Sequence, residues 1–250
     1  MGDSTFDEIF EIERKLRTGT PDIQAVALAS IPLLMSNCAP LSVSNLFFRL
    51  TSHFLTVRDP AIVQTFRLCA PYSMHLGLHA EEMVRRLGVV WDSNDVRARG
   101  MVLCIYGWLA DGCTGVAEAV WRVQQSMGRE GEEEYEAAVM AAQKMVQVDP
   151  QRVLSAVADN ALALYCRLGQ YSFLRPKILQ VLSFPSGDCN LEKTIFYTLA
   201  AQISQEAVFR TVLFETLTSI ALRIESLALP CLDIFTQHGV DTANIRSAYQ

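Results

Sequence analysis

The sequence has few of the residues and motifs on which metal and nucleophile chemistry usually depends. Its 250 residues include four histidines, and its seven cysteines contain no C-x-x-C pair. Glycine-rich phosphate loops are missing, and so are the G-x-S-x-G and H-E-x-x-H signatures. The most recognisable marks of a nucleotide-binding fold, a serine hydrolase or a zinc protease are therefore absent. We expect no enzyme, no cofactor and no metal.

Long apolar runs are also lacking. The longest covers residues 100–110, between Arg99 and Asp111, whereas a membrane-spanning helix needs about 20 apolar residues. The first residues are acidic and contain no apolar core, so we do not expect a secretory signal. Phe6 occupies the place where a myristoylation motif has serine or threonine. We therefore expect no membrane association.

Positive charge is in short supply. The 21 lysines and arginines face 27 aspartates and glutamates, which gives a net charge of -6. A general nucleic-acid binder usually has a basic face, so direct binding to nucleic acid is not expected. The densest basic clusters, 14–17 and 85–86, are typical of solvated helix faces. Most cysteines stand in apolar runs and their number is odd, which indicates a reducing compartment rather than a disulfide scaffold.

Helix signals are dense and strand signals are scarce. Thr20-Pro21, Asp59-Pro60 and Asp149-Pro150 each place a capping side chain before a proline at the first helical position. The pair Asn94-Asp95 is expected to cap a further helix. These signals predict helices at 5–16, 21–36, 43–56, 60–70, 80–90, 95–110, 115–127, 132–147, 150–168, 172–183, 191–203, 205–224, 227–237 and 241–248.

Several of these helices begin in the same way. Acidic residues open four of them at Asp22, Asp59, Asp95 and Glu134, at spacings of 37, 36 and 39 residues. Weaker members follow near 172 and 205. Helix 81–90 is amphipathic, whereas 96–110 is apolar nearly all round and must be covered on several sides. This alternation predicts stacked antiparallel helix pairs. We expect one all-α, HEAT/armadillo-like α-solenoid over 1–250, with about seven pairs.

A set of short motifs carries a more specific resemblance. They occur in order as Glu13–Gly19, Asn45–Leu50, Phe66–Cys69, Glu82–Leu87, Ser93–Leu103, Gly107–Ala110 and Tyr135–Ala142. In order and spacing they resemble the N-terminal HEAT/armadillo-like repeats of the Integrator complex subunit 7 family. The likeness is best over residues 10–150, and rests on helical character alone from 151 to 250.

The resemblance implies a non-catalytic scaffold subunit of the nuclear Integrator complex. That assembly processes the 3′ ends of small nuclear RNAs and terminates transcription by RNA polymerase II. Its other subunits would be the partners, by protein–protein interaction and without a small-molecule substrate. The expected location is the nucleus, with a cytoplasmic pool left open. Two alternatives remain: a HEAT-repeat adaptor in transport or membrane-coat assembly, and an enzyme with an unrecognised site.

Candidate interaction residues lie on the polar face of helix 80–90, at Glu81, Glu82, Arg85 and Arg86. Other patterns have simpler interpretations. His75 and His79 are four residues apart, but Gly77 between them favours an inter-helix connection over a metal site. The acidic run 129–136 is either a docking site or a charge-stabilised helix start. The tryptophans, and the pairs Phe66/Tyr72 and Phe47/Phe48, are assigned to the core in preference to an interface.

Overall fold

The computed structural model describes residues 2–77 and 79–240, and no strand occurs among them. Their α-helices are α1 Gly2–Thr18, α2 Pro21–Met35, α3 Pro40–Val57, α4 Pro60–Cys69, α5 His79–Trp91, α6 Val96–Trp108, α7 Ala110–Cys113, α8 Ala117–Met127, α9 Glu132–Val148, α10 Pro150–Arg167, α11 Leu174–Leu182, α12 Cys189–Ala200, α13 Arg210–Ala221 and α14 Ala228–Gln237. Two 3₁₀ segments, η1 Ala70–Leu76 and η2 Glu225–Leu227, accompany them. The all-α prediction is confirmed.

The chain divides into two compact units. Unit 1 comprises 1–119 and 131–137, and unit 2 comprises 120–130 and 138–250. The division falls within α8 and α9, and each unit is described by itself below. The expectation of one continuous array over 1–250 stays a prediction.

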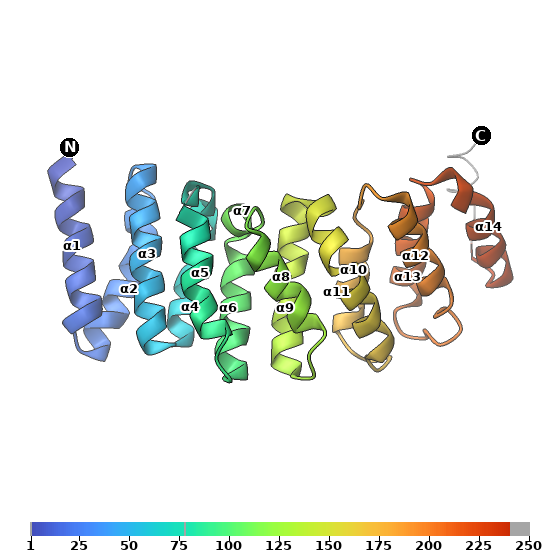
Figure 1. Ribbon diagram of the computed structural model, residues 1–250, viewed down its shortest axis with the longest axis horizontal. Coiled ribbons are helices and arrows are strands. Elements are labelled where there is room, and N and C mark those ends of the chain that lie inside the picture. The colour runs from blue at the N-terminus through green and yellow to red at the C-terminus, as the bar shows by residue number, and fades with distance from the viewer. Residues whose placement is uncertain (1, 78, 241–250) are drawn as a thin grey trace. The chain divides into compact units, whose positions relative to one another are not determined.

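Unit 1 consists of two layers of helices. In Figure 1, α1, α3 and α5 stand side by side, and each packs on its neighbour. The second layer contains α2, α4 and α6, which also pack on one another and against the first layer. We call the α1–α3–α5 layer the outer layer and the α2–α4–α6 layer the inner layer. Each outer helix with the inner helix that follows it forms one pair.

Unit 2 repeats this arrangement. Helix α10 packs on α12, α11 packs on α13, and α10 and α12 contact α11 and α13 respectively. The polar contacts between successive pairs show the repeat length directly. The Thr216 hydroxyl donates to the Leu179 carbonyl, and Gln143 donates to Gln180, each across 37 residues. Asn160 donates to the Gln124 carbonyl across 36 residues. Helical-repeat packing with the predicted period is therefore present.

The predicted helix starts depend on side-chain caps to different degrees. The carboxylates of Asp59, Asp95 and Asp149 each accept a hydrogen bond from a backbone N–H in the first turn, at 2.7–3.1 Å. Thr20 occupies the capping position of α2, but its side chain makes no capping bond, so that part of the prediction is wrong. Proline at the first position and the favourable dipole of Asp22 remain as signals there.

The predicted contrast between α5 and α6 is confirmed. Met83, Val84 and Leu87 of α5 are fully buried, whereas Glu81 and Arg85 on the opposite flank are exposed. Along α6 and its continuation, no residue from 98 to 110 is exposed. Gly100 is close to the neighbouring helix: a Cβ there would lie 3.5 Å from the Glu133 carbonyl oxygen. Helix α6 packs against α4, α5 and α7.

Two segments differ from the predicted helices. The helix expected at 205–224 begins only at Arg210, because residues 201–209 form turns around the inward-facing Glu206. After α4 the chain continues as the 3₁₀ segment η1 and turns at Gly77, whose φ is 49°. The helix expected at 241–248 lies outside the described residues. Every other predicted helix has an observed counterpart within a few residues.

Candidate interaction surfaces

The predicted polar surface lies on α5, in the outer layer. The Glu82 carboxylate accepts two hydrogen bonds from Arg85 and one from Arg86, all at 2.7 Å. These bonds, above all those from Arg85, lower the pKa of Glu82 to about 2. Glu81 is exposed one position earlier, on the same flank. Three of the four predicted residues are therefore brought together as a cluster that neutralises much of its own charge.

A shallow groove borders this cluster. The Arg86 guanidinium lies 5.1 Å from the centre of the Phe48 ring on α3, and both side chains line a hollow of about 230 Å³ with Arg49 and Ser52. Arg49 and Ser52 also line a second hollow of about 290 Å³ between α1 and α3. Arg49 is ion-paired with Glu13 in that second hollow. The outer layer thus presents charged side chains that are largely paired with one another.

The inner layer presents the opposite chemistry. Along α2, the side chains of Val26 and Leu33 are 68% and 72% exposed, and Leu68 of α4 is 53% exposed. Helix α2 contains one charged residue, Asp22, in its first turn. No motif in the sequence indicated that this apolar surface takes part in binding. One feature of the sequence could have indicated it: α2 has almost no charged residues, so the helix has no charged flank.

The aromatic residues assigned to the core divide between core and surface. Phe47 and Phe66 are fully buried and stack with ring centroids 6.3 Å apart. Phe48 and Tyr72 are half-buried. Trp91 is buried, but Trp121 is 48% exposed, so the core assignment is wrong for that tryptophan. The helical periodicity of α8 places Trp121 on its solvent side.

The two histidines with metal-site spacing, His75 and His79, lie on separate elements. His75 belongs to η1, and His79 opens α5, where its ring contacts the edge of Phe48 at 5.3 Å between centroids. The turn at Gly77 separates them, as the sequence predicted. Within the described residues, no three histidine, cysteine or carboxylate side chains gather as metal ligands would.

The acidic run 129–136 is the start of α9. Glu132 and Glu133 occupy its first turn and are exposed, whereas Glu134 is 1% exposed. The Glu134 carboxylate accepts from Arg99 of α6 at 2.9 Å, and Arg99 also donates to the Ser93 carbonyl at 2.7 Å. Glu132 and Glu133 fit the interpretation as a charge-stabilised helix start. Glu134 has a different role, because its bond to Arg99 joins α9 to α6.

The seven cysteines occur as free thiols: three are buried, two are exposed, and Cys38 and Cys104 are half-buried. Burial raises the pKa of Cys69, Cys113 and Cys231 to about 12, which keeps those thiols protonated. Cys166 and Cys189 are exposed.

None of the described helices is long and apolar enough to cross a membrane.

A buried ionic cluster in unit 2 holds the segment 201–209 in place. The Glu206 carboxylate accepts from the Tyr165 hydroxyl at 2.8 Å, from Arg175 at 2.7–2.8 Å and from the Phe209 N–H at 3.0 Å. Burial raises the pKa of Glu206, but these donors together lower it below its ordinary value. Arg175 also donates to the carbonyls of Tyr165 and Leu168. The cluster thereby ties together α10, α11 and the turns before α13.

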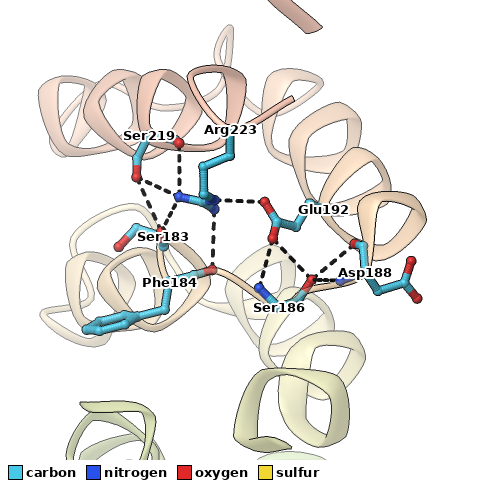
Figure 2. A network of polar contacts seen from close by, with 7 residues as sticks. All are labelled: Ser183, Phe184, Ser186, Asp188, Glu192, Ser219 and Arg223. Atoms are coloured by element: carbon cyan, nitrogen blue, oxygen red, sulfur yellow. Dashed lines mark hydrogen bonds and ion pairs between the residues drawn. The ribbon is translucent and has the colours of Figure 1, made fainter. Parts of the chain in front are cut away.

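A second polar network joins α12 to the end of α13 (Figure 2). Arg223 donates to the Glu192 carboxylate at 2.9 Å, to the Ser183 carbonyl at 2.9 Å and to the Phe184 carbonyl at 3.3 Å. Glu192 in turn accepts from the Ser186 N–H at 2.8 Å and from the Ser186 hydroxyl at 3.2 Å. Both networks bind backbone groups of connecting segments, and this is a structural role.

Comparisons with known proteins bear on the fold. No protein-family model matches the chain, and no curated protein matches it. Among solved structures, the chain is similar to the crystal structure of an engineered protein from the Northeast Structural Genomics Consortium, with a TM-score of 0.60 and 11% identity. The match covers 85% of this chain and 96% of that one. At this identity the similarity shows the fold alone.

Proposed function

We propose that the chain is a non-catalytic scaffold that binds other proteins through the exposed faces of its helical repeats. The observation that supports this proposal most strongly is the apolar surface of the inner layer of unit 1. Large exposed side chains such as Val26, Leu33 and Leu68 occur on adjacent helices, and contiguous apolar patches of this kind are typical of interaction sites. Stacked repeats suit such binding because they extend one face over many helices.

We further propose that the partners are subunits of the Integrator complex. The support is the resemblance of the colinear motifs between residues 10 and 150 to the subunit 7 family. In that setting the chain would act in the nucleus, in the 3′-end processing of small nuclear RNA and in termination of transcription by RNA polymerase II. Its contribution would be to position other subunits by protein–protein contacts.

The test is affinity purification of the tagged chain from nuclear extract, followed by mass spectrometry. The proposal predicts recovery of several Integrator subunits. The control is Leu103→Ala, which opens a cavity in the enclosed helix α6 and should lower recovery together with the fraction of folded protein. Recovery of transport or coat proteins instead would keep the scaffold function and remove the Integrator assignment. A folded chain that recovers no protein and turns over a small substrate would contradict the proposal.

A further inference from the structure

The exposed flanks of α2 and α4 form one surface. The two helices pack side by side, and both also contact α3. Each helix buries one flank, with Ile31 and Met35 of α2 and Ile62 and Phe66 of α4. At the C-terminal end of α2, Leu33 also lines a hollow of about 740 Å³ with charged side chains of α1. We define the α2–α4 face as Val26, Ala29 and Leu33 of α2 with Ala61, Gln64 and Leu68 of α4, all of which are exposed.

This face is unusually apolar for a surface in contact with water. Five of its six residues are aliphatic, and Gln64 is uncharged. Within α2, no side chain between Asp22 and Met35 carries a charge, so this helix is apolar on its buried and its exposed flanks alike. A helix of that kind is normally covered on both sides. The outer layer differs, because its exposed flank on α5 carries Glu81 and Arg85.

A cation that forms no ion pair within the described part of the chain borders the α2–α4 face beside Leu68. The Arg67 guanidinium is exposed beside Leu68 and lies 4.9 Å from the centre of the Trp108 ring on α6. Contact with the ring holds the guanidinium at the edge of the face. The acids of α2 and α4 themselves, Asp22 and Asp59, lie at the opposite, N-terminal ends of these helices. The acids of α1 that line the hollow beside Leu33 are Asp7, Glu8 and Glu11, and Glu11 is ion-paired with Arg14 and Lys15. Among the described residues no ion pair with Arg67 is formed, so a carboxylate from a partner would meet an oriented donor.

We infer that the α2–α4 face is the docking site for an amphipathic helix of a partner protein that carries an acidic residue opposite Arg67. Two packed helices present rows of side chains into which a third helix packs through residues at i, i+3, i+4 and i+7. The apolar stripe of the partner covers Val26, Leu33 and Leu68, and its acidic flank pairs with Arg67. This inference rests on the proposed scaffold function and specifies the chemistry of the partner.

The experiment compares two synthetic helical peptides with the same leucine stripe, one with glutamate and one with lysine on its flanks. Binding to the full chain is measured by fluorescence anisotropy at low salt. The glutamate peptide should bind more tightly. Leu33→Asp and Leu68→Asp should each weaken it by about tenfold or more, the change that 1.4 kcal/mol produces. Arg67→Glu should reverse the preference between the peptides. The matched control is Val89→Asp on α5, because Val89 is 67% exposed on the outer layer.

Several results would overturn the inference. These are no binding of either peptide, equal binding of both, or an equal loss in Val89→Asp. Light scattering that shows a dimer of the wild type, dissociated by Leu33→Asp, would make a second copy the occupant of the face. Circular dichroism checks that each variant is folded. If Leu33→Asp and Leu68→Asp still recover Integrator subunits, this inference fails and the proposed function stands. If the glutamate peptide binds but nuclear extract yields no Integrator subunit, the inference stands and the Integrator assignment falls.

Discussion

Replacement of Glu206 by glutamine tests whether the buried ionic cluster holds the segment 201–209. Glu206 is fully buried and Arg175 is 5% exposed, so neither charge has water as an alternative partner. Removal of one partner from a buried ion pair typically costs about 3–5 kcal/mol, because the other charge is left uncompensated. Glutamine keeps the volume of the side chain and one carbonyl acceptor, so we expect a loss of about 3 kcal/mol, at the lower end of that range.

The assay is guanidinium unfolding followed by circular dichroism, combined with hydrogen exchange of peptides from α10, α11 and residues 201–210. The lost protection should be largest in those peptides, since Arg175 also binds the carbonyls of Tyr165 and Leu168. Glu215→Gln is the control: Glu215 is exposed on α13 and its replacement should change stability by about 0.5 kcal/mol or less. Adding Arg175→Met to Glu206→Gln should recover part of the loss. Equal stability of Glu206→Gln and the wild type would refute the reasoning.

Three further predictions concern stability and reactivity. Leu103→Ala should lower the free energy of unfolding by about 2–5 kcal/mol, because it leaves a cavity at a fully buried position. Arg86→Ala should lower it by about 1 kcal/mol or less, because the ion pair of Arg86 is half-exposed. Similar denaturant midpoints for the two variants would show that the buried and exposed faces are misassigned. Thiol titration of the native chain should find Cys166 and Cys189 reactive first and all seven thiols free after denaturation, and recovery of disulfides would contradict the reducing compartment. Folding lowers the pKa of Glu206. Its contribution to stability is therefore present above its ordinary pKa of about 4.3 and is lost as the pH falls through the lowered pKa. Acid should destabilise the wild type more than Glu206→Gln, and parallel profiles of stability against pH would contradict this.

The sequence was sufficient for most helices because their signals are local. An aspartate before a proline, as at Asp59 and Asp149, fixes a helix start through one capping bond and one missing N–H. The start of α13 is different. Residues 205–209 have ordinary helix-forming character, but Glu206 turns inward to partners on α10 and α11, which are 41 and 31 residues away along the chain. Such distant contacts override local propensity and are not visible in the sequence.

The candidate surfaces were likewise predictable only where their signal is local in the sequence. The polar flank of α5 was predictable, because Glu82, Arg85 and Arg86 repeat at helical spacing. The α2–α4 face was not, because Val26 and Leu33 have the same apolar character as the buried Ile31. Only the packing of α2 against α1, α3 and α4 decides which of them are covered. Exposure, rather than residue type, identifies this face.

If the chain is a scaffold whose partner lies on the inner layer of unit 1, hydrogen exchange should locate that partner on α2 and α4. The measurement compares the chain alone with the chain in the complex recovered from nuclear extract. We expect added protection in peptides from α2 and α4, with α5 little changed. Added protection confined to a single hollow such as that beside Arg49, or no added protection in any helix, would contradict it.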